Sequence, residues 1–391
     1  MTVNLINTLS QPLKSVSKFV AYQEKANGLS GSRFVQDTAT NLVPKATFAR
    51  SKADLAENTF LELAESGLVY FVPTFLGENI FRKPFSAGLN AELKKQVAIP
   101  YSQLMKRHGK VDKRVIAAKA GLAMCALTIP IIEFSLNYIK NLFTLKTFKQ
   151  GDFNNIASLY KKEENSDVQE RVEASSKKNI KRAAAACALS IAGGILMAKK
   201  GANSKVLQNI GEAILAPGSK FFKKDGKAQK FFDKYCSLDF NGENGKLALG
   251  KGQLTSCVVI GGLGYFGAAK DRGRQNFLET LFRYPLVGFY VITGSELFEN
   301  GFKRLLQKGG KCKDIIGKDL KVPSMNELPE LAQKLAKERG TNVNAEFRKL
   351  ARQKSLVNMV PYAFSIGVMG FFVAGISNLF TKYRFEKTNL S

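Results

Sequence analysis

The sequence lacks tryptophan, contains one histidine among 391 residues and holds only five cysteines. A single histidine excludes a histidine-rich metal site and argues against a histidine-based catalytic triad. Five cysteines over so long a chain are too few for a disulfide scaffold, and no C-x-x-C pair indicates a zinc ribbon or a redox motif. We therefore expect neither a metal nor a cofactor.

Other common signatures are also absent. The first residues have no basic segment followed by a sustained apolar stretch, so we expect no secretory signal peptide. No phosphate-binding G-x-x-x-x-G-K-[ST] loop, no H-E-x-x-H and no G-x-S-x-G motif occurs. The sequence consequently favours a protein that is not an enzyme.

Long apolar runs dominate the chain instead. The longest covers residues 355–381, without a charge between Lys354 and Lys382. Helices in soluble cores show a polar face, whereas a helix that crosses a bilayer needs roughly 20 apolar residues. Shorter or charge-interrupted runs lie at 60–81, 115–139, 183–198, 252–269 and 277–298. The pattern predicts an all-α, multi-pass α-helical membrane protein with about four to six apolar helices. A variant in which 60–81 and 277–298 lie in the membrane interface stays open.

Small residues recur four positions apart within three of these runs. Examples are Ser190/Gly194, Gly264/Ala268 and Gly370/Ala374. This spacing lets helix backbones approach closely. We therefore expect these runs to pack tightly against neighbouring helices.

Two of the runs resemble each other, which predicts an internal parallel duplication. The matches, at an offset of 217 or 218 residues, are Phe60-Leu61-Glu62 with Phe277-Leu278-Glu279, Leu68-Val69 with Leu286-Val287, and Gly77-Glu78 with Gly294 and Glu296. Pro73 and Pro285 are expected to mark bends. The chain then divides into a basic N-terminal segment (1–57), a first repeat half (58–143), an apolar helix with long basic connectors (144–251) and a second repeat half (252–391, including the basic connector 299–354).

The formal charge of +27 is spread over every connector. Alternate connections carry 24 and 34 Lys and Arg residues, a contrast too small to set the orientation in a membrane. Such a surface attracts polyanions. The excess is dispersed lysine without a nucleic-acid-binding module, so we expect anionic membrane lipid and, in addition, other membrane proteins as partners, and not nucleic acid. The sequence leaves the oligomeric state undetermined.

Several ionisable residues lie in or beside the apolar runs, where charges are costly and often functional. Glu65, Lys119 and Glu133 lie deepest in their runs and form the candidate intramembrane polar site. The remaining acids lie close to the ends of their runs, where water and lysines can reach them, and are candidate repeat-related anchors: Glu62, Glu78, Glu279 and Glu296.

One motif points to a different class of protein. Gly262, Gly264 and Gly267 follow the strand-like LTSCVVIG with the spacing of a dinucleotide-binding turn. That fingerprint also needs an acidic residue about 20 positions further on, and neither Glu279 nor Glu296 fits. A glycine-rich packing face of a membrane helix is the favoured interpretation.

The leading functional prediction is a non-enzymatic membrane scaffold or interaction protein that contacts anionic lipid. A transporter or channel that uses intramembrane carboxylates is the alternative, and a dinucleotide-binding enzyme is the second alternative. The test between the first two is whether Glu65, Lys119 and Glu133 face one shared cavity, because convergence of intramembrane charges indicates a solute path.

Overall fold

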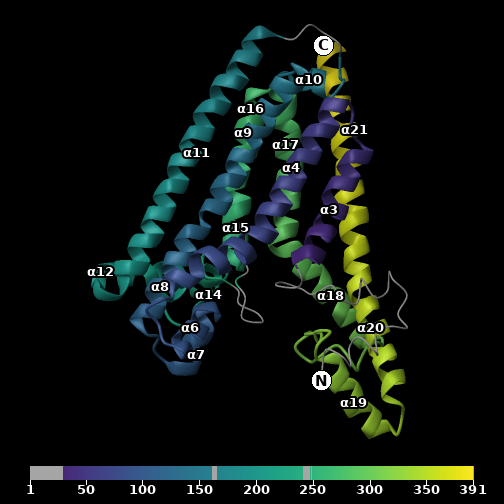
Figure 1. The fold of residues 1–391 in the computed structure, drawn as a ribbon. Coiled ribbons are helices and arrows are strands. Elements are labelled where there is room, and N and C mark those ends of the chain that lie inside the picture. Colours follow the sequence, from purple (N-terminus) through teal and green to yellow (C-terminus); the bar gives the residue numbers. More distant parts are fainter. Residues whose placement is uncertain (1–29, 161–164, 241–246, 248, 391) are drawn as a thin grey trace.

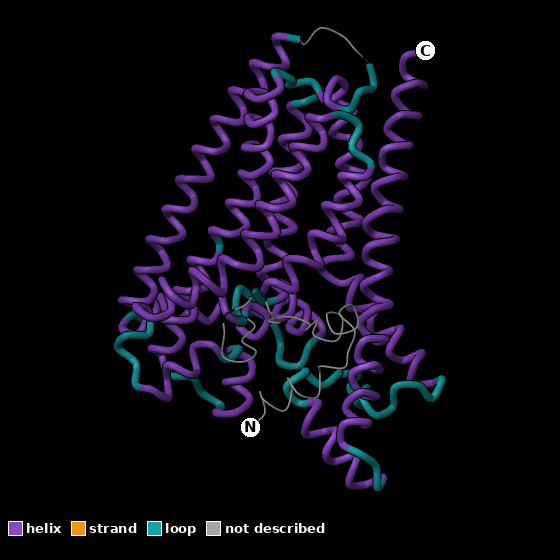
Figure 2. The backbone as a smooth tube through the Cα atoms, turned by 45° about the vertical axis from the view of Figure 1, so that its right-hand side comes forward, coloured by secondary structure: helices purple, strands orange, loops and turns teal. Residues whose placement is uncertain are grey.

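The computed structural model describes residues 30–160, 165–240, 247 and 249–390. Within these residues every regular element is a helix and none is a strand, so the all-α prediction is confirmed for the described chain (Figure 2). Long helices run side by side along one axis, and the loops gather at its two ends.

Six long helical rods contain the six apolar runs of the sequence. Their elements are α4 (Lys52–Phe71) with η1 (Val72–Arg82) and α5 (Lys83–Phe85); α8 (Lys113–Ala126) with α9 (Thr128–Phe148); α11 (Ser166–Lys200); α15 (Lys251–Ser256) with η4 (Cys257–Gly261) and α16 (Gly262–Asp271); α17 (Arg274–Phe289) with η5 (Tyr290–Gly294) and α18 (Ser295–Lys308); and α20 (Val343–Phe364) with η6 (Ser365–Phe372) and α21 (Val373–Leu390). Helix α11 begins at Ser166 and α20 begins at Val343, so the polar residues that precede the runs 183–198 and 355–381 belong to the same helices as those runs.

The rods alternate in direction, so their connections separate into two groups (Figure 1). Short connections and α10 (Phe153–Ile156) lie at one end, called the turn end. There Ser51 Oγ donates to the Ile156 carbonyl at 2.6 Å, and Phe153 N donates to the Arg272 carbonyl at 3.3 Å.

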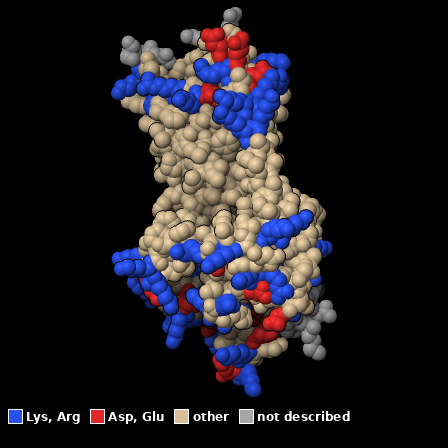
Figure 3. All heavy atoms as spheres, turned by 90° about the vertical axis from the view of Figure 1, so that its left-hand side faces the viewer, with Lys and Arg blue, Asp and Glu red and all other residues tan. Residues whose placement is uncertain are grey.

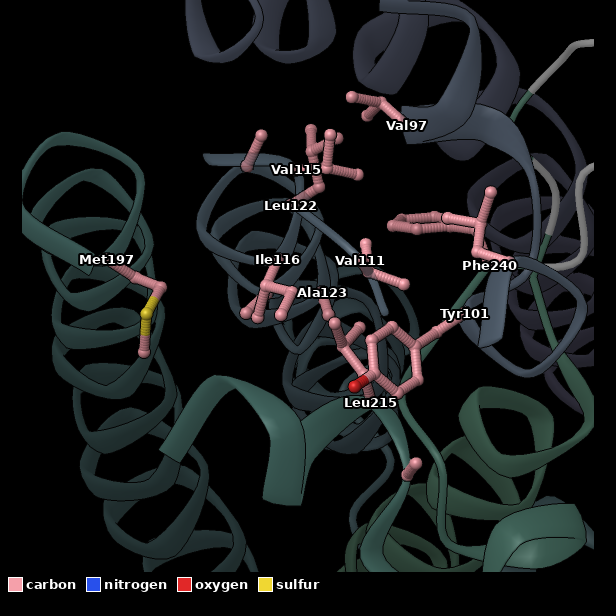
Figure 4. Close-up of a cluster of buried hydrophobic side chains, with 14 of the residues drawn as sticks. Val97, Tyr101, Val111, Val115, Ile116, Leu122, Ala123, Met197, Leu215 and Phe240 are labelled. Carbon is pink, nitrogen blue, oxygen red and sulfur yellow. The ribbon is translucent and has the colours of Figure 1, made fainter. Parts of the chain in front are cut away.

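The three long connectors lie at the opposite end, called the connector end (Figure 1). Their helices are α6 (Ala91–Ala98), α7 (Tyr101–His108), η2 (Gly201–Asn203), α12 (Lys205–Leu215), α13 (Pro217–Phe221), α14 (Lys227–Tyr235) and α19 (Leu328–Arg339). Buried side chains from α7, α8, α12 and the chain around Phe240 form an apolar cluster there (Figure 4). A second apolar cluster joins α18, α19 and α20 around Phe347 and Leu350.

A seventh bundle helix, α3 (Ser30–Thr47), lies in the segment that the sequence describes only as basic. Its mixed polar and apolar sequence contains no long apolar run. It packs against α4 and η6, and Asn378 Nδ2 donates to the Phe48 carbonyl at 2.8 Å. A Cβ added to Gly370 would meet the Thr40 carbonyl oxygen at 2.5 Å, so this glycine permits close packing.

Other small residues allow similarly close packing. On α11, a Cβ at Gly194 would lie 2.7 Å from the Gly121 carbonyl oxygen. On α16, a Cβ at Gly264 would press into the Phe134 backbone. The close helix packing expected at Gly194, Gly264 and Gly370 is thus present.

On the face drawn in Figure 3, an uncharged surface covers the middle of the bundle, between two charged ends. Within the part of the chain that the structure describes, three helices are long and apolar enough to cross a membrane: Lys113–Phe148, Ser166–Asn203 and Val343–Thr388. Only 17% of the apolar window in the second and 22% in the third is buried inside the protein. Their outward side chains include large apolar ones, such as Leu189 (73% exposed) and Phe372 (60% exposed). We call this surface the apolar belt.

The two resembling segments share several structural features. The rods of α4 and α17 both run from the turn end to the connector end along the bundle axis (Figure 1). The variant in which they lie in a membrane interface stays a prediction. Their π-helical segments begin at Val72 and Tyr290, 218 residues apart, which is the offset of the sequence match. The first rod is bent by 46° at Val72–Thr74, beside Pro73. The duplication and the four-part division stay predictions.

Candidate binding cavity

A cavity of about 260 Å³ lies inside the bundle, walled by α3, α4, α9, α15 to α17, η4 and α21. Ten ionisable side chains line it, excluding the tyrosines and the cysteine: the acids Asp54, Glu57, Glu62, Glu65, Glu133 and Glu279, and the bases Lys45, Arg50, Lys140 and Arg283. Acids therefore outnumber bases in the cavity, although the whole chain carries a formal charge of +27.

Four of the acids come from one face of α4. Successive spacings of three, five and three residues separate Asp54, Glu57, Glu62 and Glu65. At 100° per residue this spacing keeps all four on one side of a helix. The first three are at most 5% exposed, because they pack inward against the other cavity-lining helices.

Glu57 is the centre of a buried ion cluster near the turn end. Arg272 Nη1 and Thr144 Oγ1 donate to its Oε2 at 2.7 and 2.8 Å, and Lys140 Nζ lies 3.8 Å from Oε1. The Arg272 side chain is fully enclosed and that of Glu57 is 7% exposed. The cluster ties α4 to α9 and to the turn between α16 and α17.

A second ion cluster surrounds Arg50 at the same end. Its guanidinium donates to Asp54 at 3.0 Å and to both Glu279 oxygens at 2.8 and 3.3 Å, and it lies 5.0 Å from the centre of the Phe153 ring. Glu62, the sequence match of Glu279, forms an ion pair with Lys45. Both predicted anchors thus pair with bases near the turn end, and both line the cavity.

Glu65 and Glu133 line the same cavity further from the turn end. The Tyr265 hydroxyl lies 2.8 and 2.9 Å from the two Glu65 oxygens, and its ring centre is 4.9 Å from that of Tyr284. Glu133 packs against Gly261, where an added Cβ would lie 2.9 Å from its carboxyl carbon. The structure therefore brings these two predicted site residues together.

Lys119, the third predicted member, does not line this cavity. Its ammonium is 2.7 Å from Asp239 and donates to the Val97 and Ile99 carbonyls at 3.2 and 2.8 Å, within the apolar cluster of the connector end. Its apolar surroundings and polar partners give it a structural role at the base of α8.

The other two predicted anchors lie against the connector between α14 and α15. Glu78 accepts from the backbone of Leu247 and pairs with Arg82 at 2.7 Å. Glu296 pairs with Lys251, while Lys234 is 3.7 Å away. Glu78 thus contacts the connector itself, whereas Glu296 contacts the two helices that the connector joins.

The glycine motif is part of a helix and not of a strand and turn. The strand that the dinucleotide-binding alternative requires is absent, because residues 254–261 are helical and Gly262, Gly264 and Gly267 continue the helix as α16. Added Cβ atoms at these positions would collide with Tyr284, Phe134 and Tyr138. Close helix packing explains the glycines, and no phosphate-binding turn forms here.

Sequence reasoning missed Arg50, Asp54, Glu57, Lys140 and Arg283 as cavity residues. The signal for Asp54 and Glu57 was their one-sided spacing with Glu62 and Glu65, which begins before the apolar run. Within the described residues no group of three or more histidine, cysteine or acidic side chains could hold a metal ion. No protein-family profile, no curated protein and no solved structure matches the chain.

Proposed function

We propose that this chain is a multi-pass membrane transporter for a small polar solute. The observation that carries the proposal is a cavity lined by charged side chains within a bundle that has the apolar belt on its outside. Less than a quarter of the apolar window of two helices is buried inside the protein. Exposure of such helices to water is unfavourable, whereas the lipid of a bilayer covers them.

Location of the charges supports transport over a purely structural role. Intramembrane carboxylates are expensive and commonly mark solute or ion paths. Two of the three charges named as the test, Glu65 and Glu133, come from different rods and line one cavity, which supports a transporter. Lys119, the third, pairs with Asp239 outside the cavity. The buried clusters around Glu57 and Arg50 join the rods at the turn end, where rearranged ion pairs could open the cavity.

The test is flux into liposomes that contain the purified full chain. A mixture of small polar metabolites is offered outside, and internal solutes are measured by mass spectrometry. We expect at least one solute to accumulate above protein-free liposomes, and Glu65→Gln and Glu133→Gln to reduce its rate. The matched control is Glu338→Gln, an exposed acid of the connector end. Equal internal solute with and without protein would contradict the proposal.

A second proposal, which keeps the predicted lipid partner, concerns the connector end. The hairpin of α13 and α14 exposes Phe221 (69%) and Phe231 (55%) among lysines. Exposed aromatic rings beside lysines suit the headgroup layer of an anionic membrane. Phosphatidylglycerol should therefore raise the unfolding temperature of the detergent-purified chain more than phosphatidylcholine does, and Lys223→Gln/Lys224→Gln/Lys227→Gln should remove the difference. Equal effects of the two lipids on the wild-type chain would refute this contact.

A further inference from the structure

Arg283 differs from the other bases of the cavity. Lys45 pairs with Glu62, Arg50 pairs with Asp54 and Glu279, and Lys140 lies beside Glu57. Among the described residues, Arg283 has no hydrogen-bond or ion-pair partner. Its guanidinium therefore lines the cavity without a direct hydrogen bond or ion pair, and the carboxylates of Glu279 and Asp54 act on it only through space.

The sequence of α17 predicts a different partner for Glu279 from the one that it contacts. Glu279 precedes Arg283 by four residues on α17, the spacing and order that favour an ion pair along a helix. Both Glu279 oxygens instead accept from Arg50. A partly buried guanidinium needs hydrogen-bond acceptors, and its planar fork matches a carboxylate. The geometry points to a carboxylate on the solute.

The remaining charges of the cavity favour a positive group on the same solute. With six acids against four bases, the lining has a formal charge of −2. Glu65 and Glu133 lie beside the neighbouring rings of Tyr265 and Tyr284, and aromatic faces attract ammonium groups. A simple anion would pair with Arg283 but would increase the negative excess of the cavity. A solute with one negative and one positive group would complement both Arg283 and the acids.

Cavity size is compatible with a small solute. A volume of about 260 Å³ is enough for about nine water molecules at about 30 Å³ each, and so accommodates a molecule of about ten non-hydrogen atoms. We propose that the cavity binds a zwitterion of α-amino-acid size, with its carboxylate on Arg283 and its ammonium near Glu65 and Glu133. This assignment rests on the transporter proposal for the choice of site.

The experiment measures thermal unfolding of the detergent-purified full chain with three matched sets of probes: neutral α-amino acids, the corresponding amines without the carboxylate, and the corresponding N-acetyl acids. We expect one or more amino acids to raise the unfolding temperature saturably, and neither analogue to do so at equal concentration. Arg283→Gln should weaken the response about tenfold or more, because one charge-assisted contact is lost. Arg283→Lys should keep part of it.

Arg274→Gln is the matched control, because Arg274 lies on the same helix and is exposed outside the cavity. If Arg283→Gln fails to fold, Thr280→Trp replaces it, since a large ring at this lining position should fill the cavity and abolish the response. A wild-type response to the amine or the N-acetyl acid equal to that of the amino acid overturns the inference. So does an unchanged response in Arg283→Gln, or in Thr280→Trp where it replaces that variant, or no response to any amino acid.

The liposome assay separates failure of this inference from failure of the transporter proposal. Flux of another solute class at a rate unaffected by Arg283→Gln would refute the zwitterion assignment and leave transport standing. Absence of all protein-dependent flux would refute transport itself.

Discussion

The turn end and the connector end are stabilised by different interactions. At the turn end, ion pairs such as Arg272–Glu57 are enclosed, with the two side chains 0% and 7% exposed. At the connector end, apolar clusters form most of the interior. The Lys119–Asp239 pair is enclosed among them, whereas pairs such as Lys334–Glu338 lie in solvent, 71% and 54% exposed. The comparison shows that burial decides what a Lys/Arg–Glu pair does: an enclosed pair holds rods together, whereas an exposed pair contributes little.

Removal of Glu57 should give the largest effect on stability. Glu57→Ala leaves the enclosed Arg272 without its carboxylate, and breaking such a buried pair costs about 3–5 kcal/mol of unfolding free energy. Equilibrium unfolding in detergent measures the change. Glu338→Ala, the exposed counterpart, should change it by less than about 0.5 kcal/mol. Similar losses in the two variants would remove the distinction between the ends.

Truncation of a side chain in the core of the connector end should give the second-largest loss of unfolding free energy. Leu350 is fully buried between α19 and α20, so Leu350→Ala should cost about 2–4 kcal/mol through lost contacts and a new cavity. Leu305→Ala, at a position 65% exposed, is the control and should cost little. Hydrogen exchange should increase around 309–342 and stay unchanged around the Glu57 cluster. Increased exchange at both ends would mean that the two regions are not separate units of stability.

A smaller loss of unfolding free energy is expected from substitution of a glycine at which two helices pack closely. In Gly264→Ala the new methyl group would collide with the Phe134 backbone, and such overpacking costs about 1–3 kcal/mol. Gly301→Ala has open space within 4 Å and should be neutral or stabilising, because alanine is the better helix former. A stable Gly264→Ala protein with unchanged unfolding would show that α9 and α16 are not in close contact.

The smallest effect concerns an ion pair at the connector end. Hydrogen bonds from Arg339 and Lys349 lower the pKa of Asp314. A lowered folded-state pKa contributes stability above the unfolded-state pKa of about 3.9, and this contribution disappears as pH falls through the folded-state value. Asp314→Asn should therefore cost about 0.2–1 kcal/mol at neutral pH and nothing at strongly acidic pH. A difference from wild type that persists below the folded-state pKa would assign another cause to it.

Much of the helical architecture could be predicted because uncharged length is a local property of the sequence. All six apolar runs lie within long rods, whereas α3 was missed because its polar residues alternate with apolar ones. The cavity was only partly predictable. Glu65 and Glu133 can be recognised as charges inside apolar runs. The partner of Glu57 is Arg272, 215 residues away, and no local sequence pattern predicts that pairing. Lys119 looked similar in sequence, yet it pairs with Asp239 in another part of the fold.

The central claim is that a hydrated polar cavity lies inside a lipid-facing apolar belt, and thiol labelling in liposomes tests it most directly. Single cysteines replace Leu189 on the belt, Thr280 in the cavity and Lys220 at the connector end. They are introduced into a chain whose Cys187, Cys236 and Cys257 are removed, because Cys187 and Cys236 are accessible and Cys257 lines the cavity.

The account predicts that a small charged reagent modifies the thiols at positions 220 and 280, while position 189 reacts only with a lipophilic maleimide. Modification of position 189 by the charged reagent as fast as position 220 would contradict the membrane-embedded belt, and with it the transporter.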